Sequence, residues 1–241
     1  MLDAEHARHL MVDRQIAGRG VSDSHVLEAM REVPREAFVP KKLHEFAYED
    51  SPLPIEAGQT ISQPYIVAYM VEAAAVRPGD RVLEIGAGSG YAAAVMSRIA
   101  GKVFAIERHD DLTWRAGERL KRLGYDNVEL RTGDGTHGWP EAAPFDAILV
   151  AAGGPAIPQA LMEQLDIGGR LVIPVGKEER DQRLMKITRR SATQWDEEDL
   201  GAVAFVPLIG EHGWGEQGGP VRPAEPRSFR ETARETYRFG L

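Results

Sequence analysis

The chain has 241 residues, of which 43% are hydrophobic and 27% charged, and its formal net charge at pH 7 is −8. This composition is typical of a globular protein with one large domain, or one domain and an appendage, and excludes a largely disordered or fibrous chain. The acidic balance argues against a general binder of nucleic acid or anionic membranes. Cysteine is absent, which excludes thiol nucleophiles, disulfides and Cys-ligated zinc.

The first residues carry charges throughout and contain no apolar segment, so we expect no secretory signal. No uninterrupted apolar run reaches the roughly 18 residues that a membrane-spanning helix needs. The sequence therefore predicts a cytoplasmic protein.

Helical patterns come first in the chain. One is expected around residues 5–17, and a second runs from Ser22, a good N-cap, to about residue 33. Residues 34–63 are rich in proline and glycine and predict an ordered but irregular stretch, of a kind that is often functional. Pro64 then begins an apolar helix, with Gln63 as its N-cap.

From residue 81 onward, short β-branched runs alternate with helical segments. We expect strands at RVLEI, KVFAIE, NVELR, AILVAA and RLVIPV, with helices around 91–100, 111–123 and 158–165. This alternation predicts an α/β fold: a doubly wound, mostly parallel, Rossmann-like sheet of about seven strands, preceded by N-terminal helices. The later runs LMKITRR and VAFVPLI are expected to pair antiparallel at the sheet edge, with WDEEDLG as a solvated turn between them.

A glycine-rich turn follows the first predicted strand. Gly86, Gly88 and Gly90 form GAGSG, and glycine there lets the backbone turn sharply and approach a ligand. A tight turn without a ligand is the structural alternative for the glycines alone. Glu107 ends the next strand 21 residues after Gly86, a spacing that suits a carboxylate accepting both hydrogen bonds of a ribose diol. Together the features indicate a nucleoside-containing cofactor, either a dinucleotide or S-adenosylmethionine.

Two observations favour S-adenosylmethionine. The glycines occur as G-x-G-x-G rather than G-x-G-x-x-G, and no long second half is present to hold a nicotinamide. Asp134 and Gly135 follow the third strand, where the carboxylate can accept from an adenine amino group. An Asp-Gly turn has an equally ordinary structural explanation.

The arrangement VLEIGAGSGY, then AIE, then GDG resembles the class I S-adenosylmethionine-dependent methyltransferases. More specifically, VPREAFVP at 33–40, GQTISQP at 58–64 and VAFVPLIG at 203–210 resemble the protein-L-isoaspartate O-methyltransferase family, which repairs damaged proteins. The resemblance covers roughly residues 10–210. GQTISQP is the most specific of these motifs, because other methyltransferases share only the glycine turn.

The resemblance implies transfer of a methyl group from S-adenosylmethionine to the free carboxylate of L-isoaspartyl residues in proteins and peptides, leaving S-adenosyl-L-homocysteine. No metal is implied. It makes Ser62 the active-site serine whose hydroxyl holds the acceptor carboxylate, in a groove lined by Thr60, Ile61 and Gln63. It assigns the cofactor's amino acid cradle to Glu84, Gly86, Ala87 and Gly88, the ribose to Glu107, and the adenine to Asp134 and Gly135.

The local chemistry agrees with this assignment. If Pro64 begins a helix, the free amides of Tyr65 and Ile66 lie beside Ser62 and suit an anionic carboxylate. An in-line displacement by a carboxylate needs positioning rather than a strong base, and good geometry alone can lower a barrier by about 7–11 kcal/mol. We therefore expect Ser62 to position the acceptor rather than attack it. No histidine is near Ser62 in sequence, which weakens a Ser-His hydrolase interpretation.

Two departures from the family pattern keep alternatives open. After the fourth strand the chain has VAAGGPAIP, where the family more often has a threonine or small polar residue before Ala-Ala or Ala-Pro, so Gly153 and Gly154 put that loop's substrate contacts in question. The tail beyond about residue 213 is longer than in short bacterial members. The alternatives are a methyltransferase of the same fold with another peptide or small-molecule acceptor, and a noncatalytic binding module.

The domain organisation follows from these assignments. We expect N-terminal helices and a substrate-loop cap over 1–78, an S-adenosylmethionine-binding core over 79–212, and a C-terminal tail over 213–241 with a possible short helix. No association motif is evident, so a monomer that binds isoaspartyl proteins and peptides is expected, with no nucleic-acid or membrane partner.

Overall fold

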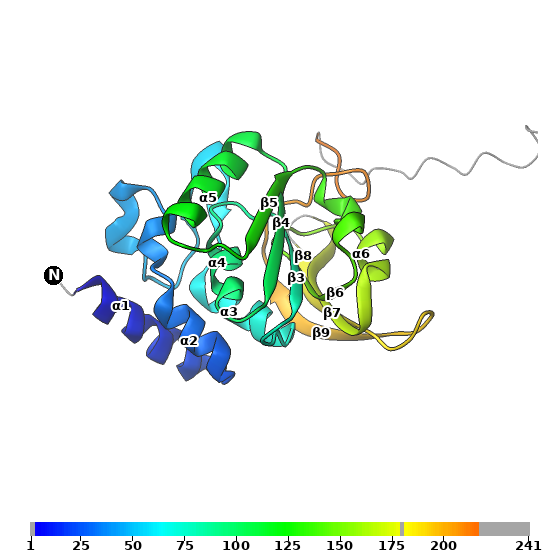
Figure 1. Ribbon diagram of the computed structural model, residues 1–241, viewed down its shortest axis with the longest axis horizontal. Coiled ribbons are helices and arrows are strands. Elements are labelled where there is room, and N and C mark those ends of the chain that lie inside the picture. Colours follow the sequence, from blue (N-terminus) through cyan, green and yellow to red (C-terminus); the bar gives the residue numbers. More distant parts are fainter. Residues whose placement is uncertain (1–2, 179–180, 217–241) are drawn as a thin grey trace, which may run out of the picture.

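A computed structural model describes residues 3–178 and 181–216 of the chain. The short helix expected in the C-terminal tail lies outside the described residues. In Figure 1 the central strands stand between helices, with α1 and α2 gathered at one end of the molecule.

Within the described residues, seven strands form one sheet in the order β5-β4-β3-β6-β7-β8-β9. Their bounds are β3 Arg81–Ile85, β4 Lys102–Glu107, β5 Val128–Thr132, β6 Phe145–Val150, β7 Leu165–Glu178, β8 Asp181–Arg189 and β9 Trp195–Val203. The strands from β5 to β7 are parallel, whereas β8 and β9 are added antiparallel. The doubly wound sheet with an antiparallel edge pair is thus confirmed. Strand order reverses between β3 and β6, which is where open α/β sheets bind ligands.

The α-helices of the described chain are α1 Ala4–Leu10, α2 Ser24–Glu32, α3 Pro64–Ala73, α4 Tyr91–Ser97, α5 Asp110–Arg122 and α6 Gln159–Glu163, and a π-helix at Met11–Ile16 continues α1. As predicted, α3 begins at Pro64 with Gln63 at the N-cap position. The N-cap predicted for α2 was wrong by one residue. Asp23 caps this helix because its Oδ1 accepts from the amides of His25 and Val26, at 3.0 and 3.3 Å. The amide of Ser22 instead donates to Glu72.

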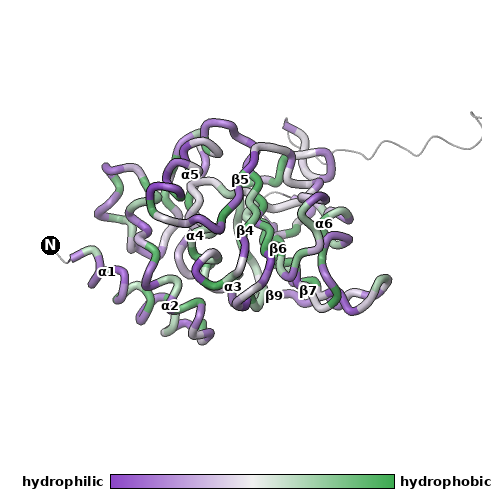
Figure 2. Tube along the Cα trace, viewed as in Figure 1, coloured by the Kyte–Doolittle hydropathy of each residue, from purple (hydrophilic) through white to green (hydrophobic). Residues whose placement is uncertain are grey.

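Alternating side chains along the strands bury both faces of the sheet. Val82, Val103 and Leu149 pack in the cluster that contains α3, α4 and α5. Their neighbours Leu83 and Ile148 pack in the second cluster, which contains Leu161 of α6. Figure 2 shows the hydrophobic residues concentrated along the central strands, with hydrophilic residues on the outer elements. Burial of both faces is what fixes the carboxyl ends of the parallel strands at one edge.

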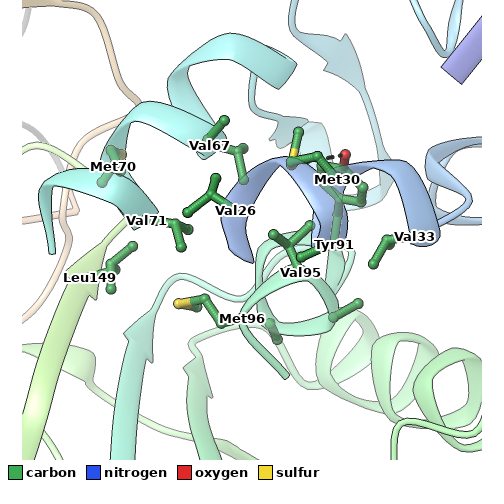
Figure 3. Close-up of a cluster of buried hydrophobic side chains, with 14 of the residues drawn as sticks. Val26, Met30, Val33, Val67, Met70, Val71, Tyr91, Val95, Met96 and Leu149 are labelled. Atoms are coloured by element: carbon green, nitrogen blue, oxygen red, sulfur yellow. Dashed lines mark hydrogen bonds between the residues drawn. The ribbon is translucent and has the colours of Figure 1, made fainter. Parts of the chain in front are cut away.

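The N-terminal helices share one core with the sheet (Figure 3). Val26 and Met30 of α2 are fully buried beside Val95 of α4, and the Tyr91 hydroxyl lies 3.7 Å from the Met30 sulfur. Val67 of α3 belongs to the same cluster. Thus α2 packs against the two helices that begin just after the predicted acceptor loop and the glycine turn.

The stretch from 34 to 63 is ordered with little regular structure, as predicted. It consists of 3₁₀ turns at Arg35–Phe38, Lys41–Phe46 and Glu56–Gly58, and a small hairpin of β1 Leu53–Pro54 and β2 Thr60–Ile61. Arg35 of the VPREAFVP motif is fully buried, donates to the Ala47 carbonyl at 2.8 Å and stacks over the Tyr91 ring. Burial lowers the pKa of Arg35. This motif therefore anchors the stretch to α4.

The prediction for the last strand was wrong. The acidic WDEEDLG segment lies in β9 rather than in a turn, and most of VAFVPLI lies beyond the end of β9 at Val203. An edge strand tolerates charge, and opposite charges facing each other across two strands stabilise the pair. The cross-strand ion pairs are Lys186–Glu198, Arg183–Asp199 and Arg190–Asp196.

Candidate active site

A cavity lies at the carboxyl ends of β3, β4 and β6, at the point where strand order reverses. It holds about 810 Å³, including its open mouth. A single cavity contacts most of the predicted site residues: Thr60, Ile61, Ser62, Glu84, Gly86, Ala87, Gly88, Glu107 and Gly135. Gln63 and Asp134 are not among its lining residues. A concave site with mostly apolar walls and a few acidic side chains suits a small-molecule ligand.

The glycine turn is held against the end of β4. The amides of Gly86 and Ala87 donate to the Ile106 carbonyl, at 2.8 and 3.2 Å. Gly86 and Gly88 have φ values of +87° and +53°, in the left-handed region that favours glycine. The Gly88 amide donates to Oε2 of Glu107 at 2.9 Å. Glu107 thus shapes the turn as well as lining the cavity.

Glu84 is a buried acid whose carboxylate is only partly satisfied, by a backbone hydrogen bond from Ala93. Its side chain lines the cavity, and its Oε2 has no hydrogen-bond partner in the described part of the protein. Burial, together with the nearby charge of Glu107, raises the pKa of Glu84 well above its ordinary value. An unpaired acid in a cavity is the group expected opposite the ammonium of a cofactor's amino acid moiety.

Asp134 and Gly135 have different environments. Gly135 lines the cavity, and a Cβ at this position would lie 2.3 Å from the Ile85 Cγ2. The Asp134 carboxylate faces an adjacent hollow and accepts from the amides of Thr136 and Glu211, both at 2.8 Å. Partial burial acts to raise the pKa of Asp134, but these hydrogen bonds hold that pKa below its ordinary value. Asp134 therefore joins the end of β5 to the segment after β9.

Another hollow, which we call the groove, opens beside the cavity. Gln63 and the α3 residues Tyr65 and Ile66 line it on one side, and residues 202–206 line it on another. Thr60, Ser62, Ala151 and Val206 line both the cavity and the groove. The Ser62 hydroxyl is partly exposed at this junction and makes no hydrogen bond to the described residues. A hydroxyl so placed is free to donate to a ligand that enters from the groove.

The predicted anion site at the start of α3 is already occupied by a side chain of the protein itself. The Tyr65 amide, expected to be free, donates to Oδ1 of Asp50 at 3.3 Å, and Gln63 Nε2 donates to Oδ2 at 2.7 Å. Asp50 takes this position because a carboxylate satisfies the unpaired amide of a helix N-terminus. Asp50 thereby fixes Gln63, the neighbour of Ser62.

The segment after β9 forms the remaining wall of the cavity. Val206, Pro207, Leu208 and Ile209 line it. Sequence analysis expected VAFVPLI to form an edge strand and so did not predict its position in the cavity wall. The loop after β6 holds this segment: the Gly153 amide donates to the Val206 carbonyl, and its carbonyl accepts from Leu208 and from the Trp214 indole. Gly153 and Gly154 line neither the cavity nor the groove.

Replacing Gly153 with alanine is expected to lower stability by about 1–3 kcal/mol, the usual effect of overpacking. A Cβ there would lie 2.3 Å from Nε2 of Gln182, whose side chain bonds to both the amide and the carbonyl of Phe205. The matched control is Gly117→Ala in α5, where a Cβ meets nothing within 4 Å. That change should stabilise by about 0.5–1 kcal/mol. Urea unfolding of both variants tests the pair, and equal effects would contradict the packing assigned to Gly153.

The lining fits a nucleoside-containing cofactor. A buried acid with one unpartnered oxygen stands at the end of β3, a second acid stands at the end of β4, and Gly135 leaves room that a Cβ would fill. Within residues 3–178 and 181–216, no group of three or more histidines and acids is placed to hold a metal ion. None of the helices in these ranges is long and apolar enough to cross a membrane.

Comparison with known proteins gives one family. The model of the protein-L-isoaspartate(D-aspartate) O-methyltransferase family matches residues 6–213. Protein-L-isoaspartate O-methyltransferase 2 of Pelobacter propionicus is 57% identical over 210 residues, covering 87% of this chain and 93% of the relative. Protein-L-isoaspartate O-methyltransferase of Methylorubrum extorquens is 59% identical over 207 residues, covering 86% and 90%.

Solved structures agree. A protein-L-isoaspartate O-methyltransferase structure superposes with a TM-score of 0.77 at 33% identity, covering 85% of this chain and 67% of the other. A beta-aspartate methyltransferase structure from Plasmodium falciparum, solved in complex with S-adenosyl-L-homocysteine, gives a TM-score of 0.73 at 28% identity. It covers 84% of this chain and 98% of the other.

Proposed function

This chain belongs to the protein-L-isoaspartate O-methyltransferase family, and from that premise we propose how its own residues divide the work. It is a protein repair enzyme that transfers a methyl group from S-adenosylmethionine to the free carboxylate of L-isoaspartyl residues in damaged proteins and peptides. We place the cofactor in the cavity and the acceptor chain in the groove.

One observation carries this placement. Ser62 has an unpartnered hydroxyl at the junction of the cavity and the groove; Thr60 has another, and the family motif favours Ser62 for the acceptor. A hydroxyl there can donate to the acceptor carboxylate while leaving the other oxygen of that carboxylate directed toward the cavity. Gln63, which the sequence also assigned to the acceptor, lines the groove but has its amide nitrogen on Asp50. We propose that Gln63 contributes the wall, and Ser62 the hydrogen bond.

The chemistry asks little of the protein beyond positioning. S-adenosylmethionine supplies an electrophilic sulfonium methyl group when bound. The acceptor carboxylate is ionised near neutral pH, so no base has to remove a proton from it. Ser62 orients the carboxylate, while Val206 at the junction and Ile61 in the cavity present apolar surface that restricts water. Such positioning can supply about 7–11 kcal/mol of the barrier lowering.

We assign the residues that bind the cofactor by the hydrogen-bonding atoms that they do not already use within the protein. Glu84 offers an unpaired carboxylate oxygen for the ammonium of the amino acid moiety, beside the turn of Gly86 to Gly88. Each oxygen of Glu107 already accepts one amide, from Gly88 and from His109, and keeps a lone pair for a ribose hydroxyl. We propose Gly135 as the surface under the adenine, with Asp134 holding the wall segment in place.

The test is the fate of the methyl group. With an isoaspartyl peptide and methyl-labelled cofactor, we expect a base-labile ester that releases methanol, followed by partial conversion of the peptide to the normal aspartyl form through a succinimide. Base-stable label would contradict carboxylate methylation. No label at all, with cofactor binding shown by calorimetry, would favour the alternative of a different peptide or small-molecule acceptor.

That alternative rested on the Gly153–Gly154 departure and on the tail. Both glycines bond to other parts of the protein, at Val206 and Pro174, and neither lines the groove. The two glycines that depart from the family pattern therefore serve to hold the cavity wall and give no reason to expect a different acceptor.

We further propose that the enzyme works as a monomer in the cytoplasm and binds no nucleic acid, in keeping with a net charge of −8. The division into a cap over 1–78, a core over 79–212 and a tail from 213 is likewise a proposal. It is supported by the hairpin of β1 and β2, which carries Thr60 and Ile61 from the N-terminal part to the mouth of the cavity.

A further inference from the structure

The groove contains one charged side chain among the described residues. Its lining consists of Arg19 together with uncharged residues from α3, from the end of β9 and from loops. Arg19 lines the groove and not the cavity, so it stands away from the junction at Ser62. A cation in this position faces the acceptor chain beside the reacting residue.

Arg19 is held in a defined orientation. Its guanidinium carbon Cζ lies over the Tyr65 ring, 3.5 Å from the ring centroid, and its Nη1 bonds to Oδ2 of Asp50 at 2.5 Å. Tyr65 in turn stacks on Tyr69 with the ring planes 8° apart. Stacking fixes the plane of the guanidinium and leaves its edge available, which makes arginine suited to carboxylate recognition.

The remaining donors of Arg19 are free. The guanidinium has five N–H groups, and the bond to Asp50 is its only hydrogen bond to the described residues. Asp50 partly balances the charge, but its carboxylate is directed at Gln63 and the Tyr65 amide and does not line the groove. An acceptor chain in the groove therefore meets the cation rather than the anion of this pair.

We propose that Arg19 is a specificity-determining residue that favours isoaspartyl sites with an acidic side chain nearby and disfavours sites flanked by lysine or arginine. This inference rests on the proposed function, because it concerns the acceptor of that reaction. Charge complementarity across a binding site sets partner preference more than overall affinity. The protein is acidic as a whole, so Arg19 supplies local attraction against a repulsive background.

The experiment uses three isoaspartyl peptides that are identical except for glutamate, glutamine or lysine at a flanking position, with each flanking position tested in turn. With the wild-type chain we expect kcat/KM to fall in the order Glu, Gln, Lys at one position or more. Each step should be about two- to fivefold, the range of an exposed ion pair. The difference should lie in KM and shrink at high salt.

Two variants change the preference in opposite directions. In Arg19→Gln the ratio of Glu to Lys peptide should fall to about one, whereas in Asp50→Asn, which removes the balancing carboxylate, it should rise. Arg19→Lys should keep the order with a smaller ratio, because lysine loses the stacking on Tyr65. Each result is a ratio of two kcat/KM values measured with the same variant, so a general loss of activity does not affect it.

The matched control is Arg190→Gln. Arg190 bonds to Asp196 at 2.6 Å, much as Arg19 does to Asp50, but it does not line the groove. This variant should keep the wild-type order. Equal kcat/KM for all three peptides in the wild-type chain, or an unchanged order in Arg19→Gln, would overturn the role of Arg19 alone. Failure to methylate even the glutamine peptide would overturn the proposed function and this inference with it.

Discussion

Replacing Ser62 by alanine is expected to lower kcat/KM for an isoaspartyl peptide by about 10- to 100-fold, the effect of losing a hydrogen bond to a charged group. The hydroxyl is unpartnered at the junction of the cavity and the groove. Its removal should therefore weaken the positioning of the acceptor and leave folding stability nearly unchanged. Steady-state methyl transfer measures the loss, and calorimetry should show a much smaller change in affinity for S-adenosyl-L-homocysteine.

Ser62→Thr is the matched control, because it keeps the hydroxyl while adding a methyl group. It should recover most of the activity lost in Ser62→Ala. Equal losses in both variants would mean that the shape of the junction matters rather than the hydrogen bond. An alanine variant with full activity would remove Ser62 from the site.

Replacing Glu84 by glutamine is expected to stabilise the ligand-free protein and weaken its cofactor binding. Its carboxylate is buried with Oε2 unpartnered, and a polar group left so typically costs about 1–3 kcal/mol, more when it is charged; glutamine removes that charge. The variant should therefore unfold several degrees higher than the wild-type chain in a thermal scan without cofactor. Affinity for S-adenosyl-L-homocysteine should fall by about 2–5 kcal/mol, since the ammonium would lose its buried partner.

The stability difference should depend on pH in one direction. Burial raises the pKa of Glu84 well above its ordinary value, so the folded protein holds a proton that the unfolded chain has already lost. Stability of the wild-type chain therefore falls as pH rises from the unfolded-state pKa toward the raised folded-state pKa. Glutamine does not titrate. The advantage of the variant should be smallest at the acidic end of this window and reach its full size above it.

Glu107→Gln should have the opposite effect on stability from Glu84→Gln. Both carboxylate oxygens of Glu107 already accept amides, from Gly88 and His109, so an amide group there would place a donor against a donor. This variant should lose stability as well as cofactor affinity. If Glu84→Gln also lost stability without cofactor, the assignment of a destabilising buried charge to Glu84 would be wrong.

The parts of the site that sequence predicts well are those set by local geometry. The turn at Gly86 and Gly88 follows directly from a buried strand, and Glu107 ends the next parallel strand, so the sheet itself brings them to one edge. Likewise Pro64 opens α3 and leaves Ser62 just before it. Each of these placements depends on residues close in the chain or on neighbouring parallel strands.

The parts that the sequence does not reveal depend on contacts between distant segments. Asp50 occupies the start of α3 and holds Arg19, 31 residues earlier in the chain, and neither residue stands in a motif that points to the other. The acidic residues of β9 contradict strand propensity and are explained only by the basic side chains on β8. Asp134 has the position expected of an adenine ligand, yet its Oδ2 accepts from the amide of Glu211, which lies 77 residues later in the chain.

The central claim is that this site distinguishes an isoaspartyl carboxylate from a normal aspartyl one. The most direct measurement is methyl transfer from labelled S-adenosylmethionine to two peptides that differ only in that linkage. We expect base-labile label on the isoaspartyl peptide and none above background on the aspartyl peptide. Equal labelling of the two, or label on neither while the cofactor is bound, would contradict the account.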